Sequence, residues 1–166
     1  MGSTFSGLAY HLVFSTKYRK ATLTDLIRPA IYEYIGGIIA NKHGRMIEIG
    51  GIADHVHILT SCPTTVALAD FVRDIKANSS KWLHEEKRER GFQWQSGYGV
   101  FTVSRSQVEV VRHYIGNQAE HHRKQSFKEE FRGLLIKHGI EFEEKYLFEN
   151  ETIAPQSPLE ARLTGE

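Results

Sequence analysis

The chain has 166 residues, 40% of them hydrophobic and 25% charged, with a formal net charge of +1, so one soluble globular domain with a tail is expected. No apolar run approaches the roughly 18 residues that span a bilayer, and the first residues lack the pattern of a signal peptide, so we expect a cytoplasmic protein. The only cysteine, Cys62, excludes an internal disulfide, so any metal would need histidine and oxygen ligands.

The first expected elements are a strand and a helix. Residues 8–18 alternate apolar side chains, as a strand does, and end in Lys17-Tyr18-Arg19-Lys20. Three cations around an aromatic ring could bind phosphates and stack a base, but a solvated strand end explains them equally well. A helix is predicted from about Thr24 or Arg28 to about Lys42, since isoleucines recur there at helical spacing.

A hairpin of two strands, 45–52 and 55–61, is predicted next. The second strand begins His55-Val56-His57, and alternation places both imidazoles on one face while Val56 and Ile58 share the other. Two imidazoles side by side could clamp a metal ion. Histidines at this spacing are, however, more often incidental or structural, so a metal site needs a third ligand.

Two further helices and a strand follow. A helix over about 65–88 leaves Arg73, Lys76 and Lys81 off its buried stripe, and a strand is predicted near 98–103. The pattern Ser106-x-x-Glu109 predicts a capping box that opens a helix on which Tyr114 and Gln118 lie one turn apart.

The last predicted helix, 127–137, has an apolar side formed by Phe131, Leu134 and Leu135. We therefore place one domain at residues 1–148 and a polar, disordered tail at 149–166. The order strand, helix, strand, strand, helix, strand is that of an α+β ferredoxin-like sandwich, also called RRM-like, with an antiparallel sheet and two helices on one face. The open face, with the two histidines, would be covered by the tyrosine-bearing helix of this chain or of a partner.

Charge and ligand chemistry indicate a site for a polyanion. Residues 1–124 hold 16 Lys+Arg against 11 Asp+Glu, whereas residues 125–166 hold 5 against 9, so the part with the histidines is mildly basic. An amide oxygen from Gln118 beside two imidazoles suits Mg²⁺ or Mn²⁺ better than zinc. His121 and His122 are alternative ligands, but neighbours on a helix point about 100° apart, and we expect both to face solvent or DNA.

These residues resemble a known family. His-hydrophobic-His on a strand, followed about sixty residues later by Tyr-x-x-x-Gln on a helix, is similar to the single-tyrosine HUH transposases of small bacterial insertion sequences, the IS200-like family, including the REP-associated tyrosine transposases. The run from His11 to Lys20 also resembles that family's first strand. The resemblance covers about residues 7 to 125.

The resemblance implies a metal-dependent transposase that cleaves and rejoins single-stranded DNA near hairpins through a 5′-phosphotyrosine. It implies Tyr114 as the nucleophile, His55, His57 and Gln118 as ligands of Mg²⁺ or Mn²⁺, and a homodimer whose active sites are shared between subunits. From charge and location, Lys17, Arg19, Lys20, Arg73, Lys76 and Lys81 are expected to bind DNA. Two rivals remain: a non-catalytic nucleic-acid-binding module, and a small metallohydrolase that uses one of His121 and His122.

Overall fold

The structure, a computed structural model, describes residues 2–148, so the tail predicted at 149–166 lies outside the described residues. The strands are β1 (Ala9–Ser15), β2 (Arg45–Ile52), β3 (His55–Ser61) and β4 (Gly99–Val103). The helices are α1 (Arg28–Asn41), α2 (Leu68–Glu86), α3 (Val108–Gly116), α4 (Gln118–His121), α5 (Phe127–Lys137) and α6 (Glu144–Leu147). Two 3₁₀ turns, η1 (Lys17–Arg19) and η2 (Arg105–Gln107), follow β1 and β4.

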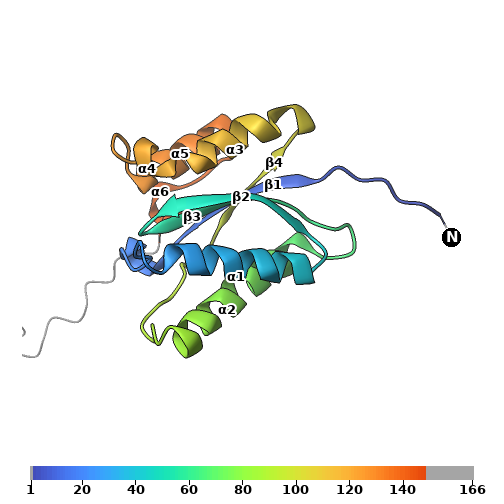
Figure 1. Ribbon diagram of the computed structural model, residues 1–166. Coiled ribbons are helices and arrows are strands. Elements are labelled where there is room, and N and C mark those ends of the chain that lie inside the picture. Colours follow the sequence, from blue (N-terminus) through green and yellow to red (C-terminus); the bar gives the residue numbers. More distant parts are fainter. Residues whose placement is uncertain (1, 149–166) are drawn as a thin grey trace, which may run out of the picture.

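The strands form one antiparallel sheet in the order β2-β3-β1-β4, with α1 and α2 against one face (Figure 1). The predicted ferredoxin-like α+β sandwich is therefore confirmed. Val56 and Ile58 are fully buried in the core between the sheet and these two helices. Strand alternation then places His55 and His57 on the opposite face, as predicted.

The opposite face is covered by the chain's own later helices, α3 to α5 (Figure 1). Phe127, Phe131 and Leu135 of α5 pack against Val13 and Phe101 of the sheet. A separate cluster joins α3 to the sheet through Val108, Ile115, Leu59 and Val103. The histidine face thus lies in the interior of a three-layer arrangement, helices on sheet on helices.

Two local predictions were wrong. The strand predicted to reach residue 18 ends at Ser15, because the chain turns through η1, where Tyr18 and Arg19 have positive φ angles. Ser106 forms no capping box, because it lies inside η2 and α3 begins two residues later. The N-cap residue of α3 is Gln107, whose side chain makes no capping hydrogen bond. A capping box forms instead at α5, where Ser126 and Glu129 exchange hydrogen bonds.

The helix predicted to carry both Tyr114 and Gln118 is divided at Asn117, which ends α3 and precedes α4. The interruption is slight, because the His121 N–H still donates to the Asn117 carbonyl at 3.0 Å. The two side chains therefore keep nearly the one-turn relation that the sequence predicted. Within residues 2–148, none of the helices is long and apolar enough to cross a membrane.

Candidate metal and nucleophile site

Two histidines of β3 form the sheet side of the site. His55 and His57 are both fully buried, and their ring centroids lie 5.1 Å apart. They project from the same face because they are two residues apart on a strand, and Phe127 of α5 stacks on the His55 ring at 4.6 Å. The apolar cover excludes water from this side of the imidazoles.

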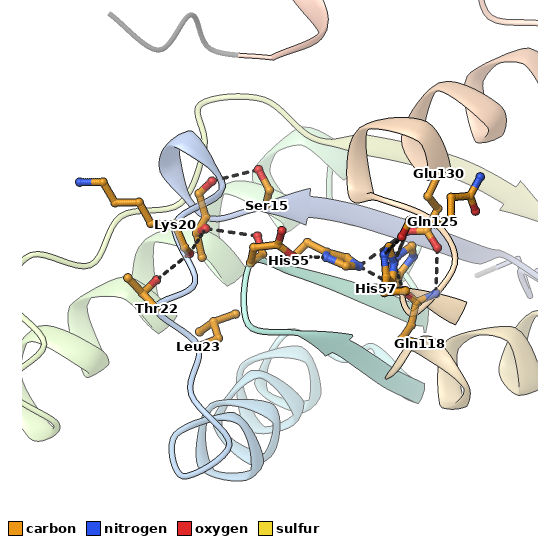
Figure 2. A network of polar contacts seen from close by, with 12 residues as sticks. Ser15, Lys20, Thr22, Leu23, His55, His57, Gln118, Gln125 and Glu130 are labelled. Carbon is orange, nitrogen blue, oxygen red and sulfur yellow. Dashed lines mark hydrogen bonds and ion pairs between the residues drawn. The ribbon is translucent and has the colours of Figure 1, made fainter. Parts of the chain in front are cut away.

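Each imidazole has a polar partner on its outer nitrogen. Nδ1 of His55 is 2.6 Å from Oδ1 of Asp54, and Nδ1 of His57 is 2.8 Å from Nε2 of His11, on β1. Such partners fix the tautomer and the orientation of a metal-binding histidine. In both residues they leave Nε2 directed toward the centre of the site (Figure 2).

The helix side brings Tyr114 and Gln118 to the same place. Oε1 of Gln118 lies 3.1 Å from Nε2 of His55, and the Tyr114 ring lies with its centroid 5.8 Å from that of His57. Gln118 is almost completely buried, whereas Tyr114 is partly accessible. The predicted meeting of a phenol and an amide with two imidazoles therefore occurs within one chain.

A fifth residue, Glu130 of α5, lies at the centre of the cluster and was missed in the sequence (Figure 2). Its Oε1 accepts a hydrogen bond from Nε2 of His57 at 2.7 Å. Its Oε2 accepts from the Tyr114 hydroxyl and from Nε2 of Gln118, the latter at 3.1 Å. One signal was available: Glu130 stands three residues after Phe127, at an apolar position of the helical repeat.

Burial and hydrogen bonds together set the protonation states of the side chains in this cluster. Burial, with the neighbouring charge of His57, lowers the pKa of His11 to about 3, and burial lowers the pKa of His57 to about 4, so both are neutral at pH 7. Burial alone would raise the pKa of Glu130, but hydrogen bonds from His122 and His57 outweigh it and hold that pKa below its usual range. Burial and the bond to Glu130 raise the pKa of Tyr114, which is therefore a neutral phenol.

His122 also belongs to the site, which corrects the expectation that it faces solvent or DNA. Its Nε2 lies 2.9 Å from Oε1 of Gln118 and 3.2 Å from Oε1 of Glu130, and its side chain is 3% exposed. Burial alone would lower the pKa of His122, but the hydrogen bond and charge of Glu130 leave it raised. His121 points past the cluster and stays 35% exposed, although its Nε2 approaches Oε2 of Glu130 at 3.4 Å.

The donor set fits a divalent cation. The ligand atoms of His55, His57, His122 and Glu130 all lie within 4.8 Å of one another. Nδ1 of His55 is bonded to Asp54, so its Nε2 faces the amide oxygen of Gln118, whose nitrogen donates to Glu130. A cation between Nε2 and this oxygen would be bound by both atoms.

The first group of predicted DNA contacts, Lys17, Arg19 and Lys20, lies at the same end of the sheet as the site. Thr16 connects the two, because its N–H donates to the Asp54 carbonyl at 2.9 Å and its hydroxyl to the Lys20 carbonyl at 2.6 Å. Lys20 is exposed, while Lys17 and Arg19 are half-buried. Figure 2 shows Lys20 on the side of His55 away from Glu130.

The second group, Arg73, Lys76 and Lys81, is on α2 and therefore on the face of the sheet opposite the site (Figure 1). Nζ of Lys76 donates to the carbonyls of Gln95 and Gly97 at 2.6 and 2.8 Å, so it holds the loop before β4. Arg73 is exposed but forms ion pairs with acidic neighbours on its own helix. The structure thus divides the six predicted DNA contacts into one group at the site end of the sheet and one group on α2.

Comparison with known proteins identifies relatives of this chain. Residues 4–118 match the family model described as "Transposase IS200 like". The transposase for insertion sequence element IS200 of Salmonella typhimurium is 31% identical over 118 residues, which cover 67% of this chain and 76% of that protein. The ISDra2 transposase TnpA of Deinococcus radiodurans is 29% identical over 117 residues, which cover 67% and 84%.

A solved crystal structure gives the same picture for the fold. A transposase structure from Deinococcus radiodurans R1 superposes with a TM-score of 0.56 at 25% sequence identity, over 71% of this chain and 96% of that one. The family match ends at Gln118, so it includes His55, His57 and Tyr114 but neither His122 nor Glu130.

Proposed function

Since the chain belongs to the IS200-like transposase family, we propose that it cleaves and rejoins single-stranded DNA through a covalent bond between Tyr114 and a 5′-phosphate. One observation supports this above the others. The hydroxyl of Tyr114, the amide of Gln118 and two imidazoles converge on one water-poor centre, and each comes from a position that the family resemblance predicts.

The chemistry of the cleavage step follows from these groups. The hydroxyl oxygen of Tyr114 attacks the phosphorus of a phosphodiester in the DNA strand. A bond forms between this oxygen and the phosphorus, and the bond between the phosphorus and the 3′ oxygen breaks. The phenol proton leaves Tyr114 along its hydrogen bond to Glu130, and the departing 3′ oxygen takes up that proton from Glu130 to become a hydroxyl, which returns Glu130 to a carboxylate. The ester energy is retained, so the reverse attack by a 3′-hydroxyl rejoins DNA without ATP.

His55, His57 and Gln118 would hold the divalent ion, Mg²⁺ or Mn²⁺, in this proposal. When bound, the ion polarises the scissile phosphate and stabilises the leaving oxygen. Asp54 and His11 keep the two imidazoles turned toward it through their hydrogen bonds to the Nδ1 atoms. Because Tyr114 is a neutral phenol in the metal-free protein, the positive charge also favours its loss of a proton.

The substrate of the proposal is single-stranded DNA that carries hairpins. Lys17, Arg19 and Lys20 at the site end of the sheet would guide the strand to the tyrosine. Arg73, Lys76 and Lys81 lie on α2, across the sheet from the tyrosine, so they would contact a different part of the DNA. Lys76 already bonds three backbone carbonyls and is the weakest candidate.

The decisive experiment is capture of the covalent adduct. Wild-type protein, Tyr114→Phe and Tyr146→Phe are incubated with stem-loop single strands and Mn²⁺, then separated under denaturing conditions. Tyr146 is 75% exposed on α6 and is a matched control for loss of one phenol hydroxyl. We expect an adduct in wild type and Tyr146→Phe and none in Tyr114→Phe. DNA binding with no adduct in any of the three would instead indicate a binding module.

A homodimer with shared sites is the further part of the proposal. In the structure Tyr114 lies at the histidines of its own chain, which supports cleavage within one chain, whereas the family resemblance implies exchange between subunits. Mixing Tyr114→Phe with His57→Ala separates the two arrangements. Exchange of helices restores one working site per dimer and gives an adduct on the His57→Ala chain, whereas cleavage within one chain gives none.

A further inference from the structure

Glu130 is a buried carboxylate with an unusual set of partners. Its side chain is 2% exposed, and its ion-pair partners within residues 2–148 are imidazoles, those of His55, His57, His121 and His122. A buried negative charge is costly unless a positive charge or several hydrogen bonds compensate it. The hydrogen bonds supply part of this compensation, and a bound cation would supply the rest.

The atoms around Oε1 of Glu130 lie at separations close to those of neighbouring ligands around one ion. Ligands about 2.1 Å from a small divalent ion lie about 3.0 Å apart when adjacent and about 4.2 Å apart when opposite. Oε1 of Glu130 lies 2.7, 3.2 and 3.6 Å from Nε2 of His57, His122 and His55 respectively. A carboxylate oxygen is also the ligand that Mg²⁺ and Mn²⁺ prefer, and the two imidazoles with Gln118 provide no negative charge.

We propose that Glu130 is a fourth protein ligand of the metal centre and that its second oxygen holds the Tyr114 hydroxyl beside the ion. This inference rests on the proposed function, and it extends it, because Glu130 is supplied by α5, outside the segment that matches the family. The helix is fixed in place by Phe127, Phe131 and Leu135 against the sheet and by the capping box at Ser126. The carboxylate is therefore presented by a rigid element.

Binding of the ion requires two neighbouring imidazoles, His57 and His11, to change tautomer. In the metal-free site Nε2 of neutral His57 donates to Glu130, and as a ligand the same nitrogen must be bare. Nδ1 of His57 then carries the proton and donates to Nε2 of His11, 2.8 Å away, and the proton that His11 held on Nε2 moves to its own Nδ1. Glu130 loses a hydrogen bond from His57 and gains the ion in its place.

The test measures Mn²⁺ binding directly, by titration calorimetry and by the loss of the free-ion electron paramagnetic resonance signal, without DNA. The variants are Glu130→Gln, Glu130→Asp, His57→Ala and the control Glu120→Gln, which removes the same charge from an exposed position on α4. We expect Glu130→Gln to weaken Mn²⁺ binding at least tenfold and Glu120→Gln less than twofold. Glu130→Asp keeps the charge and should lie between them, with an altered visible absorption spectrum of bound Co²⁺.

The outcomes separate this inference from the proposed function. If His57→Ala abolishes Mn²⁺ binding while Glu130→Gln binds as tightly as wild type, the metal centre stands and the role of Glu130 is refuted. If wild type itself binds no Mn²⁺, the metal dependence fails together with this inference, and adduct formation in the presence of a chelator then decides whether Tyr114 acts without an ion. Should Glu130→Gln not fold, an unchanged Co²⁺ spectrum in Glu130→Asp would overturn the assignment.

Discussion

A single added methyl group at Gly50 should separate the nucleophile from the histidines. Gly50 lies on β2 directly opposite His57, and the backbone of α3 crosses over it. A Cβ atom at this position would come within 2.3 Å of the carbonyl oxygen of Ile115, the residue after Tyr114. Ordinary contacts between such atoms are about 3.5 Å, so α3 must withdraw by about 1 Å.

The expected cost has two parts. Overpacking of this kind destabilises a protein by about 1 to 3 kcal/mol, which lowers the melting temperature of a domain this size by roughly 3 to 10 °C. A displacement of about 1 Å at a reacting group can reduce its rate by about 100-fold, so Gly50→Ala should lose adduct formation well before it unfolds. Both effects are steric, since Gly50 is not among the described glycines with positive φ.

The measurements are thermal unfolding and the rate of covalent adduct formation, with Gly37→Ala as the matched control. Gly37 lies inside α1 with open space around its Cα, so alanine there should stabilise the helix by about 1 kcal/mol and leave cleavage unchanged. The reasoning is refuted if Gly50→Ala melts and cleaves like wild type. It is also refuted if Gly37→Ala loses activity to the same degree.

Three other predictions follow from the same contacts. Ser126→Ala should cost about 1 kcal/mol of stability in urea unfolding because it removes the α5 cap, whereas Ser106→Ala should cost almost nothing; equal losses would contradict the observed caps. Asp54→Asn should weaken Mn²⁺ binding by about 10 to 100-fold with the fold intact, and unchanged binding would show that Asp54 does not orient His55. In the presence of a chelator, the free energy of unfolding should fall between about pH 6 and pH 4, by up to about 1.4 kcal/mol per pH unit for each of His11 and His57. The reason is that folding lowers the pKa values of both imidazoles, so acid in this range protonates them only in the unfolded chain. His11→Asn should reduce this slope, and an identical slope would refute the assignment.

The sequence was sufficient for most of the fold because its elements carry strong local signals. The hairpin of β2 and β3 was predicted with the bounds that the structure has, since alternation and the short Ala53-Asp54 connection leave little freedom. The capping box at Ser106 was a false positive, because the S-x-x-E pattern says nothing about the preceding 3₁₀ turn, in which Ser106 lies. Local patterns predict elements better than they predict the residue at which an element begins.

The site was predicted only where residues lie close together in the sequence or repeat at a fixed spacing. His55 with His57, and Tyr114 with Gln118, are pairs of this kind. His11 and Glu130 reach the same centre from 46 and 73 residues away from His57, so only the folded sheet and α5 reveal them. A carboxylate at an apolar helical position and a histidine within a strand are compatible with many structures, and neither pattern alone distinguishes a ligand from a surface residue.

Under the proposed function, the division of the site between two parts of the chain would keep Tyr114 neutral until it is needed. The segment that matches the family supplies His55, His57, the phenol and the amide, whereas the later helix α5 supplies the negative charge and the apolar cover over His55. Without a cation, burial and that charge raise the pKa of Tyr114, so an unwanted attack on DNA is disfavoured. In the proposed function, a divalent ion at the same oxygen atoms would offset the charge, and Glu130 would then position the phenol that it otherwise keeps protonated. Truncation after residue 125 would therefore remove both the restraint and the support, and it should abolish metal-dependent cleavage even though every residue of the family match remains.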